Sequence, residues 1–357
     1  MTVEAKVGNS LEAVSKIPLT LSLSKGEPVA PMMARASTGS ARAVFAFAKK
    51  LLPSFFLTFA IFLLPFSFLH ASGVDAFLAE GVGARAQGMG GVQTALSEDL
   101  SALLANPAGL ASVSGKALAA YYAPSPLQTE SLFAAYGCPM KSVYFAAGAF
   151  QRKVSDIELT DSSGDPLGSK AFTDQAAFLS VAGGASIPLG LTLKYLQSQF
   201  KPYDVSGVGA DLGAKYIHGP YRAGVTWQDF GGTELSGKAY AGGSTGSRIP
   251  SRLRLGVAFE PWSVNVPAVN APSLSGVLAA DALLPLGRGE STTYFLGGEV
   301  WSCGRLALRA GWNGDRGWST GMSINLSRVR FDYAIVLSEN APAMSRLTTH
   351  YFFGGKS

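Results

Sequence analysis

Two parts of this sequence carry side chains that could do chemistry: a short glycine-rich stretch, and a series of charged residues spaced two apart further along. The stretch from Gly81 to Ala86 fits G-x-G-x-x-A, which binds a dinucleotide when a strand precedes it and a helix follows within a βαβ unit. An apolar leader precedes it here, so we predict no dinucleotide site. The chain has no H-E-x-x-H or C-x-x-C motif, and we predict no enzyme activity, metal site or cofactor.

Histidine and cysteine, the usual residues of acid–base and thiol chemistry, are scarce. Beyond residue 76 the only histidines are His218, in a predicted turn, and His350, in the last predicted strand. We expect His350 to be an interior hydrogen-bonding residue rather than a base.

Cys138 and Cys303 fall in turns eight strands apart in the order given below. Because bridged Cα atoms lie about 6 Å apart, we predict two free thiols.

The charged residues stand on segments with two different faces. Residues 252–260, RLRLGVAFE, place Leu253 and Leu255 on one face and Arg252 and Arg254 on the other. Such alternation predicts β-strands, and a lipid-facing exterior around a polar interior explains it. The same period of two recurs in residues 221–230, 317–326, 328–337 and 345–353.

Counting all such segments predicts an all-β chain that folds into a transmembrane antiparallel β-barrel of about 14 strands. An even number of strands closes the barrel without an unpaired edge. A soluble β-sandwich or a solenoid is the alternative, but it does not explain the strand number, the inward charges and the leader together. The predicted strands are 116–123, 130–137, 141–150, 174–184, 191–198, 205–217, 221–230, 252–260, 274–283, 293–301, 304–312, 317–326, 328–337 and 345–353.

The alternation also predicts which polar side chains face the lumen. Because they mix both signs and an unpaired buried charge is costly, we expect most to pair with each other and with whatever fills the lumen, and a minority to contact a ligand head group. The longest connections, residues 151–173 and 231–251, are predicted external loops. The predicted lumen-facing residues are Lys194, Asp211, Lys215, Arg222, Arg252, Arg254, Glu260, Asp281, Glu299, Arg309, Arg330, Asp332, Arg346 and His350.

The first 76 residues read as a leader. Residues 1–72 carry a net charge of +4 out of the chain's +5, so the rest is nearly neutral and predicts no nucleic-acid partner. Lys49-Lys50, the apolar run to Leu69 and the small residues after it have the layout of a signal peptide, here residues 42–71 or 42–76. A permanent membrane anchor is the alternative. Met32 or Met33 is a possible start.

The stretch from Gly83 to Ala111 contains glycines that let the backbone bend, followed by a predicted short helix over residues 100–105 with Ser97-Glu98-Asp99 at its start and Pro107 ending it. Together with VTWQDFGG (225–232), RLRLGVAF (252–259) and LALRAGW (306–312), it resembles the PorV/PorQ family of FadL-like outer-membrane β-barrel proteins. That resemblance implies a periplasmic plug or hatch over 77–113 and a barrel over 114–357. The residues it implies for the plug and gate are Gly88, Gly90, Gly91, Asn106, Pro107, Ala108 and Gly109.

The resemblance implies export to the outer membrane of a diderm bacterium, with outer-membrane lipid around the barrel, and it leaves two functions open. In the first, a FadL-like barrel conducts hydrophobic small molecules through the plugged lumen. In the second, a non-transporting, PorV-like accessory barrel binds secreted proteins or a secretion system through its external loops, for protein secretion or surface attachment. A hydrophobic ligand is the expected partner in the first case and a protein in the second.

Overall fold

A computed structural model describes residues 78, 81–125, 128–161, 163, 165–200, 203–238, 244–264, 273–287, 291–338 and 341–353. The predicted leader, with its signal peptide, lies outside these residues. Among the helices described, none is long and apolar enough to cross a membrane.

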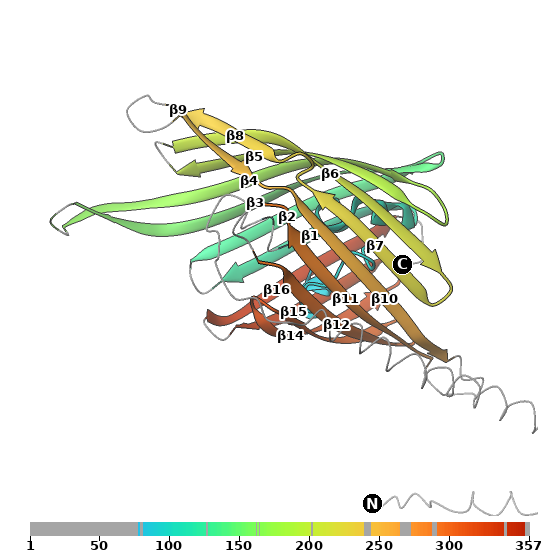
Figure 1. Ribbon diagram of the computed structural model, residues 1–357. Helices are drawn as coiled ribbons and strands as arrows, with labels where there is room; N and C mark the ends of the chain where they lie inside the picture. The colour runs from blue at the N-terminus through green and yellow to red at the C-terminus, as the bar shows by residue number, and fades with distance from the viewer. Residues whose placement is uncertain are drawn as a thin grey trace, which may run out of the picture. The chain divides into compact units, whose positions relative to one another are not determined.

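The described chain forms a closed ring of fourteen antiparallel strands, as predicted, and Figure 1 shows them side by side. Consecutive strands pair along the chain, and β1 pairs with β16 to close the ring. The ring strands are β1 (Lys116–Ser125), β2 (Thr129–Met140), β3 (Val143–Thr160), β4 (Pro166–Gly183), β5 (Leu189–Phe200), β6 (Tyr203–His218), β7 (Tyr221–Gln228), β10 (Arg252–Val264), β11 (Leu274–Pro285), β12 (Thr293–Ser302), β13 (Leu306–Asn313), β14 (Gly317–Leu326), β15 (Val329–Ser338) and β16 (Ala341–Phe353).

Each ring strand presents large apolar side chains on the outer face. A soluble protein rarely exposes so much contiguous apolar surface, whereas a membrane-spanning barrel requires it. Closure also pairs the backbone of every strand with its neighbours, which the hydrocarbon of a bilayer demands. One such exposed side chain from each strand is Leu118, Leu132, Phe145, Leu179, Leu193, Val208, Val225, Leu255, Leu278, Val300, Leu308, Met322, Phe331 and Leu347.

The two predicted external loops are in fact largely β-structure. Residues 151–160 and 166–173 extend β3 and β4, and Ile157 pairs with Lys170 beyond a bulge. Residues 231–251 contain a hairpin, β8 (Thr233–Lys238) and β9 (Ser244–Ile249), in which β8 pairs with the outer part of β6. Their mixed polar composition favoured loops, but outside a membrane both faces of a strand can be polar while the backbone ladder continues.

The segment from Gly81 to Val113, called the plug below, lies inside the ring and appears blue and teal in Figure 1. It contains the short helix α3 (Ala84–Gly88), the single turn α4 (Ala102–Ala105) and the 3₁₀ helix η1 (Pro107–Ser112). Nearly all its side chains are buried.

The predicted helix starts later than expected. The prediction placed Ser97-Glu98-Asp99 before a helix beginning at Leu100, but α4 begins at Ala102. The carboxylate of Asp99 instead accepts hydrogen bonds from the backbone N–H (3.0 Å) and hydroxyl (2.5 Å) of Ser101, which holds residues 99–101 in a turn. Pro107 ends α4, as predicted, and also begins η1.

A matched pair of substitutions tests the lipid-facing assignment. Leu193, near the middle of β5, and Leu189, at its end, are exposed on the same face. We expect Leu193→Arg to lower the free energy of unfolding by about 2–4 kcal/mol and Leu189→Arg by about 0–1 kcal/mol, since an arginine costs most at the bilayer midplane. Denaturant titration of the barrel refolded into lipid vesicles measures both, and equal small losses would contradict a membrane-spanning wall.

Candidate functional site: the plugged lumen

Ion pairs fasten the acidic and basic side chains of the plug to the wall. Arg85 of α3 pairs with Glu299 of β12 at 2.8 Å, and Glu299 in turn pairs with Arg309 of β13. Glu98 of the plug pairs with Arg222 of β7. Because several of these side chains are buried, removing one partner would leave an uncompensated charge and cost about 3–5 kcal/mol.

Asp99 joins the plug to strands β15 and β16. Its carboxylate lies 2.6 Å from Arg330 Nη2 and 3.7 Å from His350 Nε2. Burial alone would raise the pKa of Asp99, but its electrostatic interactions with His350 and with the guanidinium of Arg330, together with the hydrogen bond from Ser101, hold this pKa well below its usual range. The carboxylate of Asp99 therefore stays ionised and binds the wall electrostatically.

Asp281 of β11 binds the plug backbone directly. Its Oδ2 atom accepts hydrogen bonds from the N–H groups of Gln93 and Thr94, both at 2.9 Å, and from the Thr94 hydroxyl at 2.7 Å. Arg254 Nε donates to the same oxygen at 3.0 Å. Charge-assisted bonds of this kind are about twice as strong as neutral ones, so Asp281 is a principal attachment point.

Glycines of the wall allow the plug backbone to approach without intervening side chains. A Cβ atom added at Gly311 would lie 2.0 Å from the carbonyl carbon of Met89, and one at Gly297 would lie 2.3 Å from its oxygen. Real Cβ atoms do not approach so closely, so these positions admit only glycine while the plug is docked. The inward glycines whose added Cβ would lie within 3.2 Å of a backbone atom of the plug are Gly190, Gly213, Gly224, Gly256, Gly297, Gly311 and Gly321.

The three glycines predicted for the first part of the plug lie at this interface. Gly88 packs against Gly321 of β14. Gly90 and Gly91 have φ angles of 73° and 93°, in the left-handed region that favours glycine. The N–H of Gly90 donates to the hydroxyl of Ser319 at 2.9 Å. These glycines turn the chain where it touches the wall.

The predicted Asn106–Gly109 element lies against β5 and β6. Asn106 donates from Nδ2 to the carbonyl oxygens of Thr94 (2.9 Å) and Ala214 (3.2 Å), while its side-chain oxygen accepts from the N–H of Ala108. Pro107 lies over Gly190, and an added Cβ at Gly109 would lie 2.3 Å from the carbonyl oxygen of Ser97. The structure thus gives this element a packing role at the junction of plug and wall.

The predicted lumen-facing residues all have buried or partly buried side chains. Lys215 donates to the carbonyl oxygen of Ser97 at 2.9 Å, and Arg254 Nη2 donates to the carbonyl oxygen of Gly91 in the plug. Asp332 of β15 accepts from Arg330 and lies 3.4 Å from His350 Nε2. The buried members are Lys194, Asp211, Lys215, Arg252, Arg254, Asp281, Glu299, Arg309, Asp332, Arg346 and His350, and the partly buried ones are Arg222, Glu260 and Arg330.

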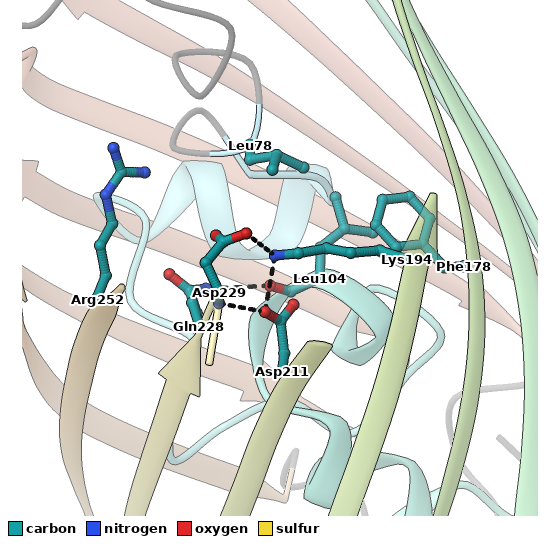
Figure 2. Close-up of a pocket in the computed structure, with 8 residues that line it drawn as sticks. All are labelled: Leu78, Leu104, Phe178, Lys194, Asp211, Gln228, Asp229 and Arg252. Atoms are coloured by element: carbon teal, nitrogen blue, oxygen red, sulfur yellow. Dashed lines mark hydrogen bonds and ion pairs between the residues drawn. The ribbon is translucent and has the colours of Figure 1, made fainter. Parts of the chain in front are cut away.

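Lys194, Asp211 and Asp229 form a separate buried cluster beside α4. Lys194 Nζ lies 2.7 Å from Asp211 Oδ1 and 3.0 Å from Asp229 Oδ1, as Figure 2 shows. Asp229 was absent from the prediction because it lies after the end of β7 and breaks the alternation, with a φ of 50°. The cavity next to this cluster measures about 10 Å³, which is room for about one water molecule.

One part of the lumen wall is apolar, contrary to the uniformly polar interior that the sequence pattern predicted. The inward positions of β1–β3 are mostly alanine and aromatic residues, so both faces of these strands are apolar and the polar alternation is lost. Ser131, Ser180 and the Arg152–Asp174 pair interrupt this surface. We call the following buried residues the apolar sector: Ala117, Ala119, Tyr121, Ala123, Phe133, Ala135, Tyr144, Ala146, Phe150, Ala176, Phe178 and Ala182.

The apolar sector belongs to a larger hydrophobic cluster that also includes residues of β5, of the β8–β9 hairpin and of the plug. Leu196 of β5, Leu235 of β8 and Ile249 of β9 join the same hydrophobic cluster. From the plug, Leu100 and Leu103 join it. One apolar cluster therefore reaches from the β8–β9 hairpin along β1–β5 to the plug.

The residues that could suggest a nucleophile, a metal site or a disulfide lie in surroundings that do not fit those roles. Residues 317–321, GWSTG, match G-x-S-x-G, but a nucleophilic serine needs a strand-to-helix turn, whereas Ser319 lies within β14 and binds Gly90. Within the described residues, no three His, Cys, Asp or Glu side chains cluster closely enough for a metal ion. Cys138, in β2 rather than in the predicted turn, and Cys303 are both free thiols, as predicted.

A closed ring of fourteen strands, an apolar outer face and a lumen filled by the chain's own plug together define a plugged transmembrane β-barrel. Two solved structures share this fold over most of the chain. The toluene transporter TodX of Pseudomonas putida is 13% identical, with a TM-score of 0.52 over 77% of this chain and 99% of that one. The toluene transporter TbuX of Ralstonia pickettii is also 13% identical, with a TM-score of 0.50 over 78% and 100%.

These similarities establish the fold of the FadL-like barrels. No protein-family model and no curated protein matches the sequence.

Adjacent glycines on β12 test the docking of the plug. Gly297 faces Met89, whereas at Gly298 the nearest contact of an added Cβ is Leu278 at 3.2 Å. We expect Gly297→Val to expel the plug and make residues 84–113 sensitive to protease, while Gly298→Val leaves them protected. Limited proteolysis of the purified barrel, with mass spectrometry of the fragments, reports the result. A protected plug in Gly297→Val would contradict the close backbone contact.

Proposed function

We propose that this protein conducts hydrophobic small molecules across the outer membrane through its plugged lumen. The apolar sector is the observation that carries this proposal. The lumen of a barrel that passes polar solutes is polar and water-filled. A wall of alanine and aromatic side chains instead offers hydrophobic molecules a surface on which they leave water favourably.

The filled lumen implies that passage requires a rearrangement. The cavity beside the Lys194 cluster and a second one under α3, lined by Arg85, Met89 and Leu96, measure about 10 and 20 Å³. Each holds about one water molecule, and neither could hold an aromatic hydrocarbon. The docked plug is therefore the closed state of the proposed pathway.

The likeness to barrels described as toluene transporters supports the proposal, as does a solved structure of TodX described as a monoaromatic hydrocarbon channel. Within the FadL-like barrels, we assign the chain to the PorV/PorQ branch on the sequence resemblance given above. The proposal includes removal of the leader as a signal peptide, residence in the outer membrane of a diderm bacterium, and Gly88–Gly91 and Asn106–Gly109 as parts of the gate.

Neighbouring residues of β4 allow a direct test. Phe178 is buried in the apolar sector and Leu179 is exposed on the outer face. We expect Phe178→Gln to reduce toluene uptake into proteoliposomes several-fold, because it interrupts the apolar surface with a polar group, while Leu179→Gln leaves uptake near that of the unmodified protein. Gel mobility before and after heating controls for folding. Uptake no faster than through protein-free liposomes would refute transport.

A second candidate function is that of an accessory barrel that binds a secreted protein or a secretion system. The extended β3–β4 hairpin and the β8–β9 hairpin favour this function, since both lie at the end of the ring where the external loops were predicted. In the described chain, β9 pairs only with β8, so its other edge is free. A free strand edge is a ready surface for pairing with another chain.

Shortening the β3–β4 hairpin separates the two functions. Val154 pairs with Phe172 just before the bulge, so replacing residues 156–170 with a short turn keeps the ladder below it. Toluene uptake should be unchanged if the lumen carries the function. Under the accessory function, a protein that co-purifies with the unmodified barrel would be lost from the shortened variant, and its retention would count against this surface.

A further inference from the structure

The contacts between the plug and the lumen wall differ in kind around the ring of strands. The polar contacts that the structure defines between plug and wall run from β5 around the ring to β16. The close glycine contacts to the plug backbone also lie between β5 and β14. Among the wall residues that make these polar contacts are Thr192, Arg222, Asp281, Glu299, Arg330 and Thr348.

On β2 and β3 the plug meets the wall through leucine side chains. A Cβ added at Gly137 would lie 2.7 Å from Leu100 Cδ2, and one at Gly148 would lie 3.2 Å from Leu103 Cδ1. α4 packs against β3 and β4. We call the interface between these two leucines and the inward side chains of β1–β4 the apolar seam.

The two interfaces differ in what parting them costs. Separating buried ion pairs leaves two uncompensated charges, each of which is costly in a lumen without bulk water. Separating apolar side chains breaks dispersion contacts and exposes apolar area. A hydrophobic molecule that fills the space restores the contacts and covers the exposed area, so the free-energy cost of opening is largely offset. The apolar seam is therefore the interface that such a molecule can open.

The wall leaves no other way past the plug on this side. The ladders β1–β2, β2–β3 and β4–β5 run without interruption, and the ladder β3–β4 is regular from Val143 to Val154. The apolar sector leads along this closed wall to the seam. At its far end lies Tyr144, whose buried hydroxyl has no hydrogen-bond partner in the described chain, an uncommon state that a water molecule admitted by an opening of the seam could relieve.

We propose that hydrophobic solutes cross the plug at the apolar seam, between Leu100 and Leu103 and strands β2 and β3, while the plug stays fastened to β5–β16. This rests on the proposed function and names its pathway. The leucines move aside, and the attachments at Asp281, Glu299 and Arg330 remain intact. The solutes are apolar molecules small enough to replace leucine side chains, such as one aromatic ring.

Matched cysteine variants test the seam with a reactive probe of that size. The parent protein carries Cys138→Ser and Cys303→Ser, which removes both native thiols. Leu103→Cys places a thiol in the seam, and Leu96→Cys places one in the plug cluster that packs on β10–β12, where Ala258 and Phe295 lie. Both leucines are buried, at 0% and 5% exposure. The probe is N-phenylmaleimide, and mass spectrometry follows labelling.

We expect Leu103→Cys to react at least about tenfold faster than Leu96→Cys, and excess toluene to slow the reaction. A second pair on the wall, Ala146→Cys of β3 and Ala258→Cys of β10, should show the same order with smaller changes in packing. Equal rates, or faster labelling on the β10–β12 side, would overturn the seam. If labelling fails while toluene still enters proteoliposomes, the pathway is wrong and the transport function stands. If labelling succeeds without uptake, the seam stands and transport fails.

Discussion

The close approach of the plug backbone to the lumen wall is the constraint on which the rest of this structure depends. At Met89 and Gly90 the main chain of the plug lies where the side chains of residues 297 and 311 would otherwise be. Glycine at both positions makes the contact possible. Seven inward glycines extend this surface from β5 to β14, so the wall on that side is shaped to one backbone path.

Ion pairs and charge-assisted hydrogen bonds hold the plug in the position that the wall glycines allow. The plug brings Arg85, Glu98 and Asp99 into a lumen that carries complementary groups, and Asp281 binds two of its backbone N–H groups. Each of these groups would be costly to bury alone. Their pairing explains why a polar half of the lumen can exist without being filled by water, and why the apolar half remains as the weaker interface.

The sequence predicted the fold well and the site less completely. Period-two alternation identified the fourteen ring strands and the inward charges, because side chains on a strand alternate between lipid and lumen. It could not identify the inward glycines as a docking surface, since a glycine has no side chain to mark a face. It missed β8 and β9, where polar residues occur on both faces, and Asp229, which lies at a break in the alternation. It also missed the apolar sector, because apolar residues on both faces of β1–β3 conceal which face lies inside.

The plug is held on one side and yields on the other when a hydrophobic solute passes. Hydrogen–deuterium exchange of the purified barrel, measured with and without saturating toluene, tests this claim most directly. The predicted result is faster exchange at residues 100–104 with toluene, and unchanged protection at the N–H groups of Gln93 and Thr94 that Asp281 binds. Loss of protection across the whole plug at once, or no change anywhere in it, would contradict the account.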